Sequence, residues 1–193
     1  MNTQEKLDRL EEKISSKEFR ENLGSANEVS YFIFDYDPKE EITVRKYLRK
    51  LTNKINSKDY YDFHIVNFDI YDMIIEYLTE EEDLINDVID MEASEGFEEV
   101  SSSIKDAMGI ETLDENYFVK RIKEETEMDS VVFVTGLGKA YPIVRVHKIL
   151  KNLHLTIENV PVIVFVPGTY SGTEIKLFGR LNANYYRAFK LFD

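Results

Sequence analysis

The feature that most constrains this chain is a set of four short apolar runs, each of strand length, separated by long segments with helical character. The runs cover residues 29–34, 61–68, 130–135 and 161–166. In the first run, residues 29–34, nearly every residue is apolar, so both faces of that strand are expected to be buried. Strands that alternate with helices join through right-handed crossovers into a parallel sheet covered on both faces. The sequence therefore predicts a three-layer α/β fold with a mostly parallel sheet, of the P-loop or Rossmann-like kind.

The N-terminal segment predicts one charged helix over residues 3–22. Leu7, Leu10 and Ile14 recur at helical spacing and give this helix a narrow apolar stripe. A stripe of this width fits two roles, which are packing on the sheet and docking on another protein. Both interpretations stay open at the level of sequence.

The next helix is predicted to begin directly after the first strand. Asp37 is a favourable N-cap, and Pro38 suits the first helical position because its missing N–H has no helical partner there. This helix is expected to end near Asn53. The side chains expected to face the core are Ile42, Tyr47, Leu48 and Leu51. Further helices are predicted over 69–78, 113–127 and 143–155, and a closing edge strand over 184–192.

The length of 193 residues predicts a single α/β domain that spans residues 1–193. The chain has no cysteine, which excludes a disulfide framework, a thiolate zinc site and a cysteine nucleophile. No run approaches the roughly 18–20 apolar residues that a membrane span needs. No apolar signal core follows Met1 either. We therefore expect a cytoplasmic protein with no membrane partner.

Charge is distributed unevenly along the chain, whose net charge is −13. Residues 76–99 contain eleven acidic side chains and no lysine or arginine, whereas residues 139–193 contain eight basic and three acidic side chains. We interpret residues 79–113 as an acidic helical insertion. Solvated helix faces explain such runs, and so does an acidic lobe that meets a basic partner. The acidic balance also predicts that direct nucleic-acid binding is weak.

The strongest candidate for chemistry is the glycine-rich turn after the third predicted strand. Ligands of open parallel sheets bind beyond the carboxyl ends of the strands, where this turn is expected to lie. A P-loop needs a glycine five residues before its Gly-Lys pair and a hydroxyl after the lysine. Around Gly138 and Lys139 those positions hold Phe133 and Ala140. Nucleotide hydrolysis is therefore not expected, and the turn is either a structural corner or a passive anion site.

Other catalytic motifs are incomplete as well. The third glycine of a dinucleotide fingerprint would fall at Tyr141, and Ser171 does not stand midway between two glycines as a nucleophile elbow requires. His147 and His154 lie seven positions apart rather than four, so they do not match a zinc helix. We predict no catalytic residue, no metal site and no cofactor.

Four aspartates follow the predicted strands and leave an alternative open. These are Asp35, Asp37, Asp69 and Asp72. Carboxylates are ligands for hard cations, so their convergence would create a metal site. Turn and capping roles explain the same residues, and we favour those roles.

The C-terminal segment 185–189 mixes aromatic side chains with Arg187, which fits either base stacking or an amphipathic strand. Together with the glycine-rich turn, this segment completes a set of candidate residues for binding an anion or a protein partner. The set is Gly136, Gly138, Lys139, Arg145, His147 and Arg187.

Several ordered motifs occupy the chain from about Ser130 to the C-terminus. They are 135–142 (TGLGKAYP) with 145–147 and 150–153 behind it, then 160–172, 177–179 and 184–189. In this order they resemble the centre of the BrxB family, a small core component of the bacterial BREX phage-defence system. The resemblance implies a part of that machinery, which also contains a methyltransferase, the alkaline-phosphatase-like protein PglZ and a large ATPase. It implies no catalytic residue.

Three hypotheses about function follow. The first is a non-catalytic adaptor or scaffold that binds another BREX protein, with PglZ as the expected partner. The alternative is a nucleotide- or nucleic-acid-binding module that uses Lys139, Arg145, Lys148 and Arg187. The last is a metal-dependent hydrolase built on the aspartates, which requires their carboxylates to converge around a cation.

Overall fold

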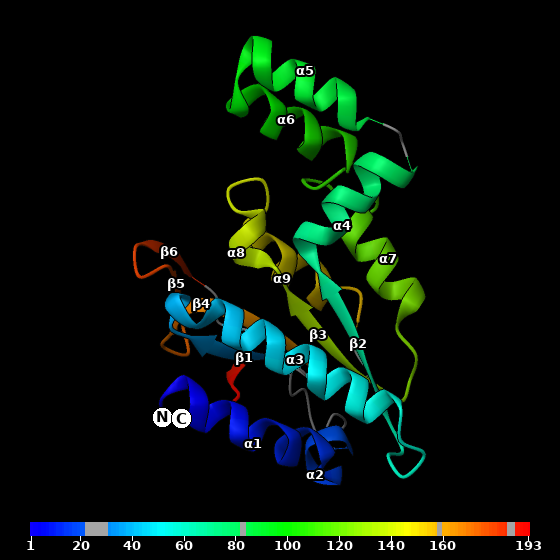
Figure 1. The fold of residues 1–193 in the computed structure, drawn as a ribbon, viewed down its shortest axis with the longest axis vertical. Helices are drawn as coiled ribbons and strands as arrows, with labels where there is room; N and C mark the ends of the chain where they lie inside the picture. The colour runs from blue at the N-terminus through cyan, green and yellow to red at the C-terminus, as the bar shows by residue number, and fades with distance from the viewer. Residues whose placement is uncertain (22–30, 82–83, 158–159, 185–187) are drawn as a thin grey trace.

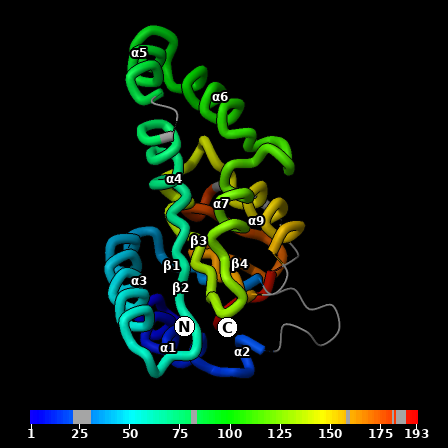
Figure 2. Tube along the Cα trace, turned by 90° about the vertical axis from the view of Figure 1, so that its right-hand side faces the viewer, coloured from blue at the N-terminus to red at the C-terminus, as the bar shows by residue number. Residues whose placement is uncertain are grey.

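A computed structural model describes residues 1–21, 31–81, 84–157, 160–184 and 188–193. It has a central sheet with helices on both faces, and the two chain ends lie close together (Figure 1, Figure 2). The described strands are β1 (Tyr31–Tyr36), β2 (His64–Asp69), β3 (Ser130–Thr135), β4 (Val162–Tyr170), β5 (Glu174–Leu177), β6 (Leu181–Asn184) and β7 (Phe189–Lys190).

The main path of the sheet has the order β2-β3-β4-β1-β7. Every pairing along this path is parallel, so the predicted parallel sheet is confirmed. β5 and β6 form an antiparallel extension that continues from the end of β4. The carboxyl ends of β1, β2, β3 and β4 therefore meet at one edge of the sheet, where a ligand site is expected.

Alternate residues of β3 explain why its sequence is apolar throughout. Val132 and Val134 belong to one buried cluster, whereas Val131 and Phe133 belong to the cluster on the opposite face. All four side chains are fully buried. A strand covered on both faces has no solvent-facing side, so it needs no polar alternation.

Helices from different parts of the chain form the two outer layers. One face of the sheet carries α1 (Thr3–Ser15), α2 (Lys17–Glu21) and α3 (Glu41–Asn56). The other face carries α4 (Ile70–Glu76), α7 (Tyr117–Glu125), α8 (Leu137–Ala140) and α9 (Val146–His154). The predicted three-layer fold class is thus confirmed.

The acidic insertion forms a hairpin of two helices, α5 (Ile85–Glu95) and α6 (Phe97–Ala107), beyond the end of α4. In both views the hairpin projects away from the sheet (Figure 1, Figure 2). Among the described residues, no helix is both long and apolar enough to span a membrane. The assignment of residues 1–193 to one domain stays a prediction.

The predicted N-terminal helix is in fact two helices, because Ser16 takes an extended conformation between them (φ −71°, ψ 132°). The apolar stripe of α1 is buried, with Leu7, Leu10 and Ile14 at most 1% exposed. Of the two roles open for this stripe, packing on the body of the protein is the one observed.

Three details of the sequence prediction were wrong. Ile42 is 65% exposed, because the inward face of α3 is set by the series Val44, Leu48, Leu51 and Ile55. β4 does not end at Pro167 but continues to Tyr170, where it pairs with β5. The predicted closing strand does lie at the sheet edge, but among the described residues it is limited to β7, and Asn184 belongs to β6 instead.

Candidate functional site

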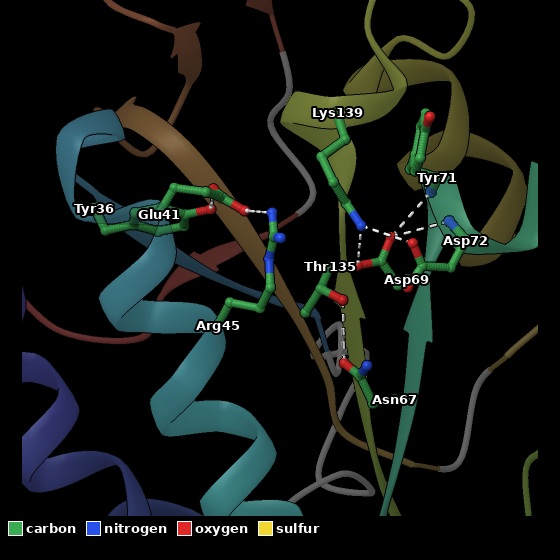
Figure 3. Close-up of polar contacts among 9 residues, drawn as sticks. All are labelled: Tyr36, Glu41, Arg45, Asn67, Asp69, Tyr71, Asp72, Thr135 and Lys139. Carbon is green, nitrogen blue, oxygen red and sulfur yellow. Dashed lines mark hydrogen bonds and ion pairs between the residues drawn. The ribbon is translucent and has the colours of Figure 1, made fainter.

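A cleft of about 190 Å³ lies at the carboxyl edge of the sheet, between α3 and the ends of β2 and β3. We call it the sheet-edge cleft. Its polar lining includes Tyr36, Glu41, Arg45, Arg49, Asn67, Asp69, Asp72 and Thr135. This is the position that open α/β sheets use for ligands, and several of its polar side chains contact one another (Figure 3).

Asp69 is the centre of the cleft and caps α4. Its carboxylate accepts hydrogen bonds from the backbone N–H of Tyr71 at 3.1 Å and of Asp72 at 3.2 Å. Gly136 makes room for this carboxylate, because a Cβ there would lie 2.0 Å from Asp69 Oδ1. Gly136 also has a left-handed backbone (φ +74°) that favours glycine. The first glycine of the turn is therefore explained by the fold itself.

Lys139 points into the same cluster rather than toward an open surface (Figure 3). Its Nζ lies 2.8 Å from Asp69 Oδ2 and 2.8 Å from Asp72 Oδ1, and 5.0 Å from the ring centre of Tyr71. Burial lowers the pKa of Lys139, but the hydrogen bonds to the two carboxylates outweigh it, and the net pKa is raised. The lysine is therefore held in its charged form by carboxylates of the chain.

The second glycine of the turn also has a packing role. A Cβ on Gly138 would lie 2.9 Å from Pro167 Cγ and 3.3 Å from Phe178 Cζ. Gly138 thus lets α8 approach Pro167 of β4 and Phe178, the residue after β5. The contacts of both glycines and of Lys139 favour the structural corner over the passive anion site.

The opposite wall of the sheet-edge cleft is a second internal network. Tyr36 Oη donates a hydrogen bond to Glu41, and Arg45 Nη2 lies 3.1 Å from Glu41 Oε1. Burial, followed by the bond to Glu41, raises the pKa of Tyr36 far above its usual range. Sequence reasoning missed this network, although the i,i+4 spacing of Glu41 and Arg45 is typical of a helix ion pair.

The four aspartates do not meet at one point, because Asp69 and Asp72 share Lys139 whereas Asp35 and Asp37 have other partners. Asp35 forms an ion pair with Lys6 and accepts a hydrogen bond from the Tyr170 N–H at 3.0 Å, which ties α1 and β4 to β1. Asp37 caps the short helix that starts at Pro38, as predicted. Because Asp69 and Asp72 are engaged elsewhere, the arrangement required for a metal-dependent hydrolase is not found.

The described residues do contain one group with metal-ligand spacing, at the opposite edge of the sheet. It consists of His64, Glu127 and Asp129, whose donor atoms lie within 4.8 Å of one another. His64 Nε2 already lies 3.1 Å from Ser130 Oγ, and the two carboxylates are exposed. His64 Nδ1 also lies 3.5 Å from Asp129 Oδ1, so polar contacts within the chain account for this group.

Arg145 and His147 lie in a different cleft, at the start of α9. Lys148 is paired with Glu111, and Arg187 lies outside the described residues. The cations named for nucleotide or nucleic-acid binding thus do not share one surface, since Lys139 faces the sheet-edge cleft. Sequence reasoning missed Arg180, which lines the cleft of Arg145 and His147 and directly follows the motif at 177–179.

The fold and the site define a three-layer α/β protein whose sheet-edge polar groups are largely paired with one another. Within this class, the chain belongs to the BrxB family: the model of the family "BREX protein BrxB" matches residues 66–191. The predicted resemblance to a component of the BREX defence system is thereby confirmed.

Two curated relatives extend this match over almost the whole chain. A BREX protein BrxB of Bacillus cereus (strain H3081.97) is 40% identical over 190 residues, which cover 98% of this chain and 97% of that protein. A BREX protein BrxB of Escherichia coli O9:H4 (strain HS) is 29% identical over 187 residues, covering 96% and 90% of the two chains. No solved structure matches the chain.

Proposed function

We propose that this chain is a non-catalytic adaptor of a BREX anti-phage defence complex that acts in the cytoplasm and binds a larger component such as PglZ. The sheet-edge cleft supports the non-catalytic part, because Lys139 is ion-paired with both Asp69 and Asp72 there. A catalytic base or a phosphate-binding lysine needs a free electron pair or a free charge for its substrate, and such pairing opposes both.

The observation that carries the adaptor role is the exposed surface of the α5–α6 hairpin. Residues 76–99 contain no basic side chain, and the exposed acidic side chains of the hairpin are Asp87, Asp90, Glu92, Glu95, Glu98, Glu99 and Asp106. Two large apolar side chains are exposed among them, Ile89 at 56% and Phe97 at 44%. Apolar anchors surrounded by charge of one sign are typical of a protein interface.

The α5–α6 hairpin is anchored to the core of the protein, and a binding surface needs such a fixed position. Val100, Ile104 and Met108 are each at most 4% exposed and belong to the main core cluster. Tyr77 Oη donates a hydrogen bond to the Ala107 carbonyl at 2.9 Å, which links the segment after α4 to the end of α6. α6 therefore packs the hairpin against the core, and α5 exposes its acidic side chains to solvent.

Charge complementarity defines the partner as a basic surface with an apolar pocket. Attraction between such surfaces speeds association and weakens as salt rises, because exposed charges are screened. The apolar anchors contribute less salt-sensitive affinity, since burying them removes apolar area from water. We therefore expect added salt to slow the association of the two proteins. Burial of the apolar anchors is expected to keep their dissociation slow.

The experiment is co-purification of the tagged chain with all other BREX proteins expressed from one operon. The test variants are Ile89→Ser with Phe97→Ser, and Asp87→Lys with Asp90→Lys. The matched control is Glu12→Lys, which reverses an exposed acidic charge on α1. We expect both double variants to lose at least about 90% of the captured partner, because interface anchors dominate affinity, while the control retains it.

Two results would contradict the adaptor role. One is a chain that elutes alone at moderate salt while every BREX protein is present. The other is an equal loss of partner in Glu12→Lys and in the hairpin variants, which would place the contact elsewhere. ATP hydrolysis by the purified chain that disappears in Lys139→Met would contradict the non-catalytic part separately.

A further inference from the structure

A second cleft, of about 300 Å³, lies between the start of α9 and the β5–β6 extension. We call it the arginine cleft. Its lining residues are Tyr141, Arg145, Val146, His147, Ile175, Leu177, Arg180 and Asn182. Three of these side chains carry or accept positive charge and none is a carboxylate, in a chain whose net charge is −13.

The two arginines of this cleft are exposed and have no ion pair or side-chain hydrogen bond with any described residue. This distinguishes them from Arg45, which pairs with Glu41, and from Lys139, which pairs with Asp69 and Asp72. A guanidinium has several donors in a planar fork that suits two oxygens of a phosphate. Arg145 and Arg180 therefore have donors available for an anion.

The pKa of His147 is lowered by its burial and by the cations around it. Burial lowers its pKa, and the charges of Arg145 and Lys148 lower it further, while Glu111 acts in the opposite direction. A neighbouring cation disfavours a second positive charge by the same field that favours an anion. The cleft is thus electropositive even though Glu111 is paired with Lys148 beside it.

The remaining walls are apolar and aromatic. Ile175 and Leu177 contribute buried side chains from β5, and Tyr141 is 36% exposed at the rim. The Tyr141 ring is held edge-on against Phe178, with the ring centres 6.4 Å apart. A flat aromatic ligand group could stack on Tyr141, with the Asn182 amide available for its polar edge.

We propose that the arginine cleft binds a mononucleotide, with its phosphates on Arg145 and Arg180 and its base against Tyr141. The volume is near the lower end of the roughly 300–1,000 Å³ typical of ligand sites. An extended strand would need a longer basic groove, and the neighbouring Lys148 is already paired with Glu111. The sheet-edge cleft is a poorer site for such an anion, because Asp69 and Asp72 are among its lining residues.

The test is calorimetric titration of the full chain with ATP, AMP, adenosine and a 12-nucleotide single-stranded DNA, at two salt concentrations. The test variants are Arg145→Gln and Arg180→Gln, which keep the three side-chain carbons next to the backbone and a polar end group and remove the charge. The control is Arg49→Gln, an exposed arginine of the sheet-edge cleft. All three side chains are exposed, so thermal melting should confirm that each variant stays folded.

We expect saturable ATP binding that weakens with salt. Removal of either arginine of the cleft should weaken it about 10-fold to 100-fold, as for a lost charge-assisted hydrogen bond, and Arg49→Gln should leave it unchanged.

Three results would overturn the proposal: no saturable binding of ATP or AMP at low salt, adenosine binding as tightly as ATP, or tighter binding of the DNA strand than of ATP. An equal loss in Arg49→Gln would assign the site to the sheet-edge cleft instead. None of these results bears on partner capture by the hairpin, so the two proposals fail separately.

Discussion

α1 and α5 are surface helices of similar length and similar sequence pattern, but their side chains are buried to very different extents. α1 and α5 are both charged helices with a few apolar side chains at helical spacing. In α1 the apolar residues Leu7, Leu10 and Ile14 are completely buried against the sheet. In α5 no residue is buried, and Ile89 is more than half exposed. α1 therefore contributes fully buried side chains to the core, whereas α5 contributes none.

The difference lies in what each helix can pack against. α1 lies over a face of the sheet and is also tied by ion pairs, from Lys6 to Asp35 and from Glu11 to Lys54. α5 packs mainly along α6, and its own apolar side chains reach the core only partly. A helix that adds little to the core yet keeps exposed apolar groups is best explained by a partner outside the chain.

The largest expected effect is on the free energy of unfolding when Leu10 is truncated. Leu10→Ala leaves a cavity in a fully buried position and should destabilise the protein by about 2–5 kcal/mol. The matched change Ile89→Ala on α5 should shift the unfolding free energy by no more than about 0.5 kcal/mol. Chemical denaturation of both variants measures the contrast, and similar losses would show that α5 belongs to the core after all.

A second contrast uses two glycines with positive φ, Gly136 in the body and Gly96 in the hairpin turn. Alanine at either site has to adopt an unfavourable backbone, but only at Gly136 does the new Cβ meet a neighbour, Asp69 Oδ1. Displacing Asp69 also weakens the cap of α4. We expect Gly136→Ala to cost about 0.5–2 kcal/mol more than Gly96→Ala, the usual value of an N-cap. Equal costs in thermal melting would mean that Asp69 has no capping role.

The third contrast concerns local opening. Amide hydrogens of α5 should exchange through a local opening of low free energy, whereas those of α1 should exchange only with unfolding of the body. Hydrogen exchange followed by mass spectrometry over peptides of the two helices measures this directly. Binding of the partner should slow exchange in α5 and leave α1 unchanged; the reverse pattern would argue for docking on α1.

The smallest expected effect is a pH dependence confined to α1. The hydrogen bond from Lys54, followed by that from Tyr61, lowers the pKa of Glu11 below its ordinary value of 4.5. A carboxyl with a lowered folded-state pKa stabilises the protein above pH 4.5, and this contribution is lost as pH falls through the lowered value. The melting temperature of Glu11→Gln should therefore lie slightly below wild type at pH 7 and converge with it in acid. A constant gap at all pH values would exclude the ion pair as the cause.

The sequence alone determined the elements whose signals are local. Runs of apolar residues predicted the strands, because a strand covered on both faces leaves no polar alternation. Asp37 and Pro38 predicted the helix start, and Phe133 and Ala140 excluded a complete P-loop, since each of these inferences needs only neighbouring residues. The ordered motifs of the second half also predicted the BrxB family, which the family match confirmed.

Only the tertiary structure decided which side chains meet across the chain. Lys139 reaches Asp69 and Asp72, and Arg180 joins Arg145 in one cleft, because strand order and crossovers bring distant segments together. The exposure of Ile42 was likewise set by how α3 sits on the sheet rather than by its own pattern. Non-local packing has no short-range signature, so charge pairing and cleft composition become visible only when the fold is complete.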